Sequence, residues 1–542
     1  MYESMEVNMF KQARRNQSKL RLALIGPSGS GKTYSSLLIA KGLGGSIAMI
    51  DTERGSGNLY SDLADYDIAE LESPFTPEKY VSAIQEAEKA GYDTIVIGSG
   101  SGMLVVENAI AQGLDVALVD AGPAGGTCLN VGCIPSKMLI AVADRVMEIR
   151  EAEKFGIKAS VDTVDFRQVM ADMRAAVRPD HEQIHRGLAA EQRLEYYEGI
   201  GRFVDDYTLQ IDDEVITGEK IFIVSGARPL IPPVPGLEEI DYLTNETLLD
   251  LETCPQSLAI IGGGYIAAEY GHFFSAMGAD VTIVQRAERL VPTEDSEVSD
   301  LLATDLRRRM SVETDAEVKN VSRTENGYAL SVTDNRTEHS KTVYAEKVLL
   351  AAGRQSNADR LAVENTGVST DGRGFIETDD YLQTSKENIW AYGDANGKAM
   401  FTHAANAEAD IAWQNAMHEE KKAFDYRTVP RAVFTYPPIA SVGMTESEAR
   451  QEGDILVGKA QYAAAAKGMA IREQERGFAK VIVNRRDLRI LGFHIIGPHA
   501  PMLIQEVVNA MALGGQPGLL FSGIHIHPAM SELIAKTFSN LA

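Results

Sequence analysis

The chain contains three segments in which a short apolar run leads into a glycine-rich turn and then into a stretch with helical periodicity. These segments lie near residues 22–38, 94–111 and 258–274. An apolar strand that turns over glycines into a helix is typical of a nucleotide-binding βα unit in a parallel sheet. The pattern therefore predicts an α/β architecture, and the irregular spacing of the segments argues against a solenoid repeat.

The pattern changes at about Tyr426. Strands are predicted at 480–483 and 489–496, and a long helix is predicted near 502–513. This part of the chain is therefore expected to form a separate α+β domain.

Composition excludes some classes of function. The 542 residues carry a net charge of −25, which argues against a nucleic-acid partner. No apolar run is long enough to cross a bilayer, so no membrane partner is expected. The N-terminus lacks the apolar region of a secretory signal, and the cytoplasm is the expected compartment. The three cysteines are too few for a disulfide framework, and no metal site is predicted.

The first glycine-rich turn matches the P-loop pattern GxxxxGK[ST]. Gly26 and Gly31 shape the loop, Lys32 would reach the β- and γ-phosphates, and Thr33 would offer its hydroxyl to Mg²⁺. Residues 18–97 resemble the start of phage-type P-loop ATPases.

The second half of such an ATPase is missing. The strand predicted at 92–97 ends in glycines and a serine rather than in the aspartate that would hold Mg²⁺. The same strand is needed by the domain that follows, and one strand cannot serve both sheets. We therefore interpret residues 1–91 as a partial P-loop segment, joined at a shared strand and without ATP hydrolysis.

The second glycine-rich turn, with Gly98, Gly100 and Gly102, opens a helix. An acidic residue, Asp120, ends the next predicted strand about 20 residues on, where the ribose of a dinucleotide is bound. The third position of the GxGxxG pattern is Met103, so this fingerprint alone is weak.

The cysteine pair Cys128 and Cys133 follows, at the start of a helical stretch. The positive end of a helix favours a thiolate, and two thiols one turn apart can close and reopen a small disulfide ring. Two buried small apolar residues would be the structural alternative. The flanking glycines and Lys137 favour the redox interpretation.

The segment GGTCLNVGCIPSK, which includes Gly126 and Thr127, resembles the redox-active segment of the pyridine nucleotide–disulfide oxidoreductases. This family includes dihydrolipoamide dehydrogenase, glutathione reductase and mercuric reductase, and the resemblance covers residues 92–542. It implies that Cys133 is the flavin-proximal thiolate and that Cys128 exchanges with the substrate disulfide. It also implies that Lys137 lies near the flavin.

Further flavin-site positions implied by the resemblance are Gly226, Gly353, Gly393 and Asp394, of which the aspartate would bind the ribityl chain. The expected fold is two Rossmann-like domains, for FAD and NAD(P), with a C-terminal α+β dimerisation domain. The predicted boundaries are 92–240 and 356–425 for the FAD domain, 241–355 for the NAD(P) domain and 426–542 for the dimerisation domain.

The third glycine-rich turn is a full GxGxxA fingerprint made by Gly262, Gly264 and Ala267, spaced for a second dinucleotide. By resemblance, Glu269 pairs with the lysine near the flavin. The next predicted strand ends in Gln285 and Arg286 rather than in an acid. A carboxylate there accepts the ribose hydroxyls of NAD and an arginine accommodates the 2′-phosphate of NADP, so both cofactors stay open.

Near the C-terminus, His527-Pro-Ala-Met-Ser-Glu532 resembles the acid–base segment of the family. A group that titrates near neutral pH suits proton transfer to a thiol. The resemblance implies that Glu532 orients the His527 ring and that the histidine serves the partner subunit of a homodimer.

The predicted activity is that of a dihydrolipoamide dehydrogenase, with free or protein-bound lipoamide as the substrate. An NADPH-dependent reductase of another small disulfide is the alternative. A mercuric reductase is disfavoured because the chain ends without tail cysteines, and a glutathione reductase because the segment reads HPAMSE. An ATP-driven DNA-processing factor is disfavoured by the missing aspartate and the acidic charge. Cys254 is expected to be an inert thiol.

Overall fold

The computed structural model describes residues 38, 41, 48–51, 67–70, 92–472 and 477–542. The chain divides into two compact units, Met1–Ala90 and Gly91–Ala542. In the first unit, strand β1 (Ala48–Asp51) pairs in parallel with β2 (Asp67–Glu70). The predicted phosphate loop, with Gly26, Gly31, Lys32 and Thr33, lies outside the described residues.

The first sheet of the second unit is built around β3 (Tyr92–Ile97). This strand lies between β4 (Val116–Asp120) and β8 (Glu214–Ile223), parallel to both. The outer strands of this sheet are β5 (Leu194–Glu198), β6 (Arg202–Asp205), β7 (Thr208–Ile211) and β18 (Ile389–Ala391). Strand β18 pairs in parallel with β8. Strand β3 is the strand that both the P-loop segment and the following domain would need. It belongs to the sheet of the second unit.

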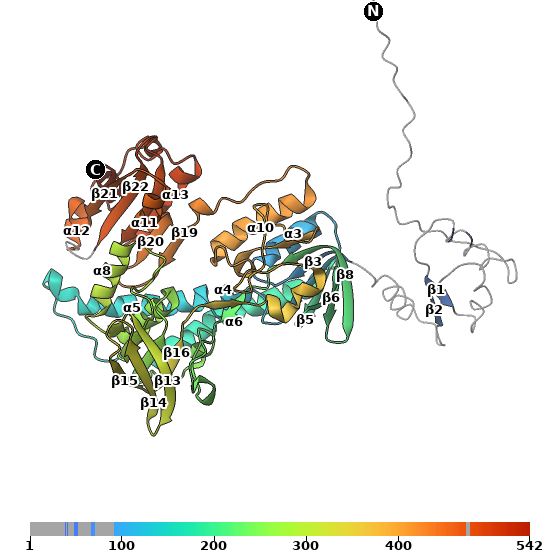
Figure 1. Cartoon of the computed structure of the whole chain (residues 1–542), viewed down its shortest axis with the longest axis horizontal. Helices are drawn as coiled ribbons and strands as arrows, with labels where there is room; N and C mark the ends of the chain where they lie inside the picture. Colours follow the sequence, from blue (N-terminus) through green and yellow to red (C-terminus); the bar gives the residue numbers. More distant parts are fainter. Residues whose placement is uncertain (1–37, 39–40, 42–47, 52–66, 71–91, 473–476) are drawn as a thin grey trace, which may run out of the picture. The chain divides into compact units, whose positions relative to one another are not determined.

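Helices pack on this sheet through apolar side chains. Helix α3 (Gly102–Ala111) buries Val105, Val106 and Ala109 and packs against α10 (Thr402–Met417). Figure 1 shows these two helices together beside β3 and β8. The hydroxyl of Ser101, at the start of α3, donates a hydrogen bond to the side chain of Asn406 in α10.

The redox segment forms α4 (Gly126–Asn130) and α5 (Cys133–Arg150), followed by α6 (Phe166–Ala190). By length and composition, residues 126–150 meet the criteria for a membrane span. Helix α5 packs against α6 and α7, and its buried Leu139, Ala143 and Val146 belong to one apolar cluster with residues of the nicotinamide domain. Helix α5 thus buries one side of its surface against these elements.

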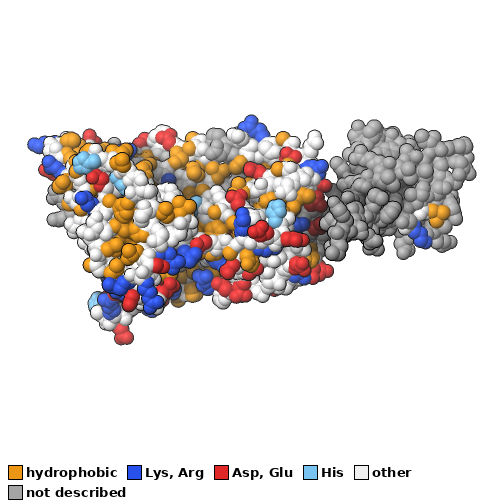
Figure 2. All heavy atoms as spheres, turned by 90° about the horizontal axis from the view of Figure 1, so that it is seen from above, with side chains coloured by type: hydrophobic (Ala, Val, Ile, Leu, Met, Phe, Trp, Pro, Cys, Tyr) orange, Lys and Arg blue, Asp and Glu red, His pale blue; other side chains and the backbone are white. Residues whose placement is uncertain are grey.

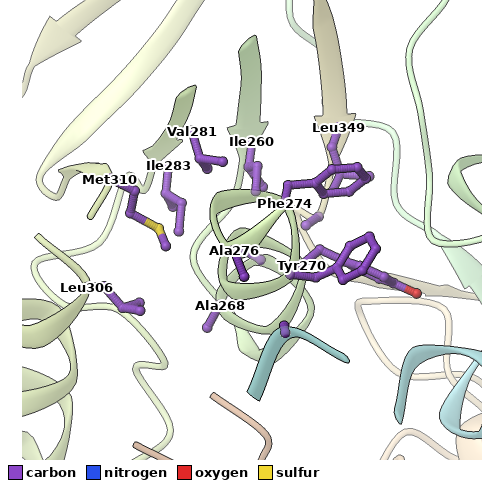
Figure 3. Packing of buried hydrophobic residues seen from close by; sticks show 14 of the residues in the cluster. Ile260, Ala268, Tyr270, Phe274, Ala276, Val281, Ile283, Leu306, Met310 and Leu349 are labelled. Carbon is purple, nitrogen blue, oxygen red and sulfur yellow. The ribbon is translucent and has the colours of Figure 1, made fainter. Parts of the chain in front are cut away.

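The domain predicted to bind the nicotinamide nucleotide has a parallel sheet ordered β12-β11-β10-β16. Its strands are β10 (Ser257–Ile261), β11 (Asp280–Val284), β12 (Ser311–Glu313) and β16 (Lys347–Leu350). Helix α7 (Tyr265–Ala276) lies beneath them. In Figure 3, Ile260, Ile283 and Leu349 extend from the strands towards this helix. The alternation within β10 and β11 places apolar residues on both faces, as a sheet covered on both sides requires.

The C-terminal domain is a five-stranded antiparallel sheet ordered β19-β20-β23-β22-β21. Its strands are β19 (Pro430–Val433), β20 (Ile439–Gly443), β21 (Ile455–Gln461), β22 (Phe478–Asn484) and β23 (Ile490–Ile496). Helix α13 (Ala500–Ala512) covers one face. The strands and the helix predicted here are present, with boundaries shifted by a few residues.

The remaining elements connect these layers. They are α8 (Ser296–Leu306), β13 (Ala316–Thr324), β14 (Gly327–Asp334), β15 (Ser340–Ala345), β9 (Ala227–Pro229), β17 (Arg354–Ser356), α9 (Ala358–Leu361), α11 (Glu446–Glu452), α12 (Ala466–Ala470) and α14 (Glu532–Phe538).

Deleting residues 1–90 tests the boundary between the units. Because β3 begins at Tyr92 and its partners β4 and β8 lie in the second unit, the shortened chain is expected to fold and to keep its flavin. The measurement is the absorbance spectrum and the mass in solution after purification. A colourless or aggregated product would contradict this boundary. The matched full-length variant Lys32→Ala is expected to leave activity unchanged.

Candidate active site

The turn after β3 is built for close approach of backbone. Gly98 has a φ of +113°, and a Cβ there would lie 2.3 Å from the carbonyl oxygen of Val224. A Cβ on Gly126 would lie 2.7 Å from the Cα of Gly100, so the two glycine loops touch back to back. Glycines at these positions leave room for a pyrophosphate against the backbone.

Gly102 supplies the helix–strand contact that the fingerprint assigns to its third position. A Cβ on Gly102 would lie 2.9 Å from the side chain of Val96 in β3. Met103 instead packs its half-buried side chain against an apolar cluster that includes Val105. The departure at Met103 is therefore compatible with close packing.

Asp120 holds the loop in shape. Its carboxylate accepts hydrogen bonds from the backbone N–H of Ser99 at 2.6 Å and from the hydroxyl of Ser99 at 2.5 Å. It also accepts from the backbone N–H of Gly122. The predicted ribose-binding carboxylate thus lies beside the glycine turn, and Ser99 is a partner that the sequence did not indicate.

One buried polar atom lines this turn without a partner. The hydroxyl of Ser225 is buried and has no hydrogen-bond partner among the residues that the structure describes, and Gly98 approaches the same Val224–Ser225 backbone. Neighbouring Gly226 has a φ of +65°. An unsatisfied buried hydroxyl beside a glycine cradle fits a bound polar group such as a flavin nucleotide.

The second flavin-side loop contains Gly393 and Asp394. Burial raises the pKa of Asp394, and Arg354, at 3.7 Å, opposes this rise. The backbone N–H of Gly393 donates to Glu408, which is fully buried and also accepts from Asn396. Glu408 therefore anchors the loop that presents Asp394.

Gly353 also adopts a φ that favours glycine, at +128°. It directly precedes Arg354, whose guanidinium donates to the carbonyl of Ala227. The loops that contain Gly226 and Gly353 are thus joined beside Asp394.

Both redox cysteines are free thiols, Cys128 half-buried and Cys133 exposed. A hydrogen bond from the Cys128 thiol is the largest influence that lowers the pKa of Cys133, to about 6, while partial burial opposes it. The hydroxyl of Thr402, 3.7 Å from the Cys133 sulfur, and the charge of Lys137 lower it further. The same bond raises the pKa of Cys128. The pair therefore holds one thiolate at Cys133 and one thiol at Cys128 near neutral pH.

Lys137 and Glu269 form an ion pair at 2.7 Å between α5 and α7. Burial raises the pKa of Glu269, and the ammonium of Lys137 and the backbone N–H of Phe434, at 2.9 Å, counter this rise. The Lys137 ammonium also lies 4.7 Å from the centre of the Phe434 ring. The pair thus joins the redox helix, the nicotinamide domain and the start of the C-terminal domain.

The glycine turn after β10 has the same geometry as the turn after β3. Gly262 has a φ of +115°, and a Cβ there would lie 2.1 Å from the carbonyl oxygen of Ala351. A Cβ on Gly264 would meet nothing within 4 Å, so this glycine faces open space at the start of α7. Ala267 is fully buried beneath the sheet.

Gln285 and Arg286 follow β11 with different exposures. Gln285 is buried, lies against Gly263 and donates to the carbonyl of Arg289. Arg286 is exposed, and among the described residues no ion pair of its guanidinium is recorded. Its charge is therefore available to a phosphate.

His527 and Glu532 lie together as predicted. The Nδ1 atom of His527 is 2.9 Å from the carboxylate of Glu532, which also accepts from the backbone N–H of Ala529. The bond with His527 lowers the pKa of Glu532. Because the carboxylate can only accept, Nδ1 carries the proton and Nε2 is free to accept one. Within this chain His527 is largely exposed and belongs to the C-terminal domain.

Cys254 lies apart from this site, half-buried against the nicotinamide domain core. Burial raises the pKa of this thiol to about 11. It is therefore protonated at neutral pH and poorly reactive.

The comparisons with known proteins agree with this geometry. Residues 92–409 match the pyridine nucleotide-disulphide oxidoreductase family, and residues 429–538 match its dimerisation domain. The chain belongs to this family. Residues 18–106 match an AAA domain, so the two matches overlap over 92–106, which includes β3.

Individual relatives differ in activity. The chain is 34% identical to the mycothione reductase of Mycobacterium tuberculosis over 464 residues, which are 83% of this chain and 99% of the relative. It is 31% identical to the dihydrolipoyl dehydrogenase of Bacillus subtilis over 461 residues, 82% of this chain and 97% of the relative. The structure of the HOCl-induced flavoprotein disulfide reductase RclA from Escherichia coli superimposes with a TM-score of 0.73 at 31% identity, covering 83% and 99% of the two chains.

This membership identifies the chemistry. The protein is a flavoprotein disulfide oxidoreductase that uses FAD and a nicotinamide nucleotide. The glycine turns at Gly98 and Gly262 have the geometry predicted for the two dinucleotide cradles, and Cys128 and Cys133 lie together as predicted for a redox pair. Thr402, Arg354, Glu408 and Phe434 contribute to the site from distant parts of the sequence, and no motif marked them in advance.

Substituting Cys128 tests the origin of the Cys133 thiolate. In Cys128→Ser the hydroxyl can still donate to Cys133, whereas Cys128→Ala removes the donor. Because a lowered pKa keeps the thiolate present above that pKa and loses it below, the thiolate–flavin absorbance should persist to near pH 6 in the serine variant. In the alanine variant the absorbance band should disappear at a higher pH, because the pKa of Cys133 is higher. Each unit by which this pKa rises corresponds to about 1.4 kcal/mol of lost thiolate stabilisation. The pH midpoint of the long-wavelength band is measured in both, and equal midpoints would contradict the hydrogen-bond explanation.

Proposed function

We propose that the enzyme acts on a small dithiol or disulfide of the dihydrolipoamide type. The supporting observation is the coupled pair at Cys128 and Cys133, with one thiol half-buried and the other exposed. The overall reaction balances as dithiol plus NAD(P)⁺ giving disulfide, NAD(P)H and a proton, and it runs in reverse for a reductase. The bound flavin supplies the two-electron link between the nicotinamide and the cysteines.

Each residue of the site has a distinct task in this proposal. Cys128 exchanges with the substrate sulfur, and Cys133 holds the thiolate next to the flavin. Lys137 stabilises that thiolate by its charge, and Glu269 fixes the direction of the ammonium. His527 moves the proton of the exchanging thiol through Nε2, because Glu532 occupies Nδ1.

The base is proposed to serve the partner subunit of a homodimer. Support comes from the match to a dimerisation domain and from the residues that flank the histidine. Ile524 and Ile526 are 102% and 76% exposed, and Met502 and Leu513 are similarly open. Figure 2 shows apolar side chains gathered over part of the visible face. Isoleucines alternating with His525 and His527 are costly to leave in water and would be buried by a second copy.

NADPH-dependent reduction of another small disulfide is the second candidate. The observation that favours it is the exposed Arg286, with no acid at the end of β11 to bind the ribose hydroxyls of NAD. The compartment proposed for either activity is the cytoplasm, where free thiols persist. The P-loop segment is proposed not to hydrolyse ATP, since β3 belongs to the flavin-side sheet and ends in glycines.

The function is tested by anaerobic titration of the purified enzyme with NADH and then with NADPH. A long-wavelength band that rises as reductant is added supports a thiolate at Cys133 beside the flavin. Turnover is then measured with lipoamide, mycothiol disulfide and glutathione disulfide. The highest kcat/KM should be found with lipoamide, and flavin bleaching without the band would overturn the cysteine relay.

The Arg286→Ala variant tests the choice of nucleotide. If the guanidinium binds the 2′-phosphate, kcat/KM for NADPH should fall by about tenfold, which corresponds to one charge-assisted contact of about 1.4 kcal/mol. The value for NADH should stay unchanged. The matched control is Arg336→Ala, whose guanidinium already pairs with Asp315 and Glu288. An equal fall in kcat/KM with both nucleotides would show that Arg286 does not bind the 2′-phosphate.

Mixed dimers test the subunit that supplies the base. Cys133→Ser and His527→Gln are each expected to be nearly inactive as homodimers. After subunits are mixed one to one and allowed to exchange, half of the dimers carry both variants, with one intact site each. Activity should then return to about a quarter of the wild-type value if the base crosses the interface. No recovery despite proven exchange would place the base and the cysteines in one subunit.

A further inference from the structure

A second polar chain joins the redox helix to the nicotinamide helix, away from the reacting groups. On α7, His272 lies one turn beyond Glu269 and is fully buried. Its Nε2 atom is 2.9 Å from the carboxylate of Asp144 on α5, and its Nδ1 atom is 2.6 Å from the guanidinium of Arg309. Arg309 also donates to the carbonyl of Tyr436 in the C-terminal domain.

The two neighbours determine which ring nitrogen carries the proton. A guanidinium only donates, so Nδ1 of His272 must accept from Arg309, and Nε2 must carry the hydrogen donated to Asp144. Burial lowers the pKa of His272, which agrees with a neutral ring. A neutral imidazole thus links the charge of Arg309 to that of Asp144.

The geometry of the two helices gives this link its importance. Helix α5 begins at Cys133, and α7 begins immediately after the nicotinamide turn at Gly262–Gly264. The two helices therefore carry the cysteine pair and the pyrophosphate turn of the nicotinamide nucleotide at their N-terminal ends. Their relative angle sets the distance from the nicotinamide turn to the redox site.

Apolar side chains pack α5 against α7, and polar contacts at two points along this interface further restrict the rotation of one helix about the other. The pair Lys137–Glu269 is the first contact. The pair Asp144–His272 is the second, seven residues or about 10 Å further along α5. Together with the apolar packing, they restrict the crossing angle of α5 and α7.

We propose that His272 is a positioning residue for hydride transfer, acting through the Asp144–His272–Arg309 chain on the crossing of α5 and α7. The ring does not touch the reacting atoms. Its loss should impair the transfer between nicotinamide and flavin, and should leave the exchange between Cys128 and the substrate sulfur unchanged.

The main test uses Asp144, because this carboxylate is 39% exposed and its removal opens no buried gap. In Asp144→Ala the second contact is lost, whereas Asp144→Asn keeps an oxygen that accepts from His272. His272→Asn keeps an acceptor for Arg309 and loses the contact with α5. The control is Glu148→Ala, an exposed acid on the same helix that pairs with Arg145.

Two half-reactions are measured in the holoenzyme by anaerobic stopped flow: reduction of the flavin by the nicotinamide nucleotide, and reoxidation by the disulfide substrate. In Asp144→Ala and His272→Asn, flavin reduction should slow by about tenfold, the scale expected for a displacement well under 1 Å. Reoxidation and the Kd of the nucleotide should be unchanged. Asp144→Asn should remain within about twofold of wild type, because it restores the hydrogen bond.

Hydrogen exchange provides a readout that does not depend on turnover. Backbone amides of α5 beyond Lys137 should exchange faster in Asp144→Ala, and at the wild-type rate in Asp144→Asn and Glu148→Ala. Equal slowing of both half-reactions, or unaltered flavin reduction in Asp144→Ala, would overturn the proposal. An equal effect of Glu148→Ala would also overturn it, since charge alone would then explain the result. If His272→Asn does not fold, the Asp144 variants decide.

Discussion

The arrangement of this enzyme depends on the ion pair between Lys137 and Glu269. Glu269 is buried, and a buried carboxylate is stable only when its charge is matched and its oxygens are bonded. The protein meets both conditions with groups from different domains, the ammonium of Lys137 and the backbone N–H of Phe434. The three domains therefore meet at one charge pair, beside the thiolate whose pKa the charge of Lys137 helps to lower.

The cysteine pair shows how local and distant groups share one task. The start of a helix and the hydrogen bond from Cys128 are local and belong to the CxxxxC spacing. Thr402 reaches the Cys133 sulfur from α10, far along the chain. Because Cys133 is deprotonated near neutral pH while Cys128 keeps its proton, the two sulfur atoms differ in reactivity.

The front segment illustrates a limit set by topology. Strand β3 is bordered on both sides, by β4 and by β8, so it has no free edge for a further strand. Both family matches nevertheless include it. A strand hydrogen-bonded along both edges can serve only one sheet, so the P-loop segment must do without it.

The two glycine turns, the cysteine pair and the predicted acid–base segment could be found from the sequence, because each is a short pattern whose chemistry depends on neighbours along the chain. Glycines with positive φ at 98 and 262, the cysteines five positions apart, and His527 with Glu532 all belong to this kind. Met103 occupies the fingerprint position where a glycine or alanine normally allows the helix to approach the strand. In the structure, Gly102 provides that close approach by lying against Val96. Three further contacts could be seen only in the folded chain: Ser99 with Asp120, Glu408 with the loop of Asp394, and Asp144 with His272 and Arg309. Those contacts join residues from 15 to 128 positions apart, which no local spacing encodes, because burial and hydrogen bonding select them only when the chain is folded.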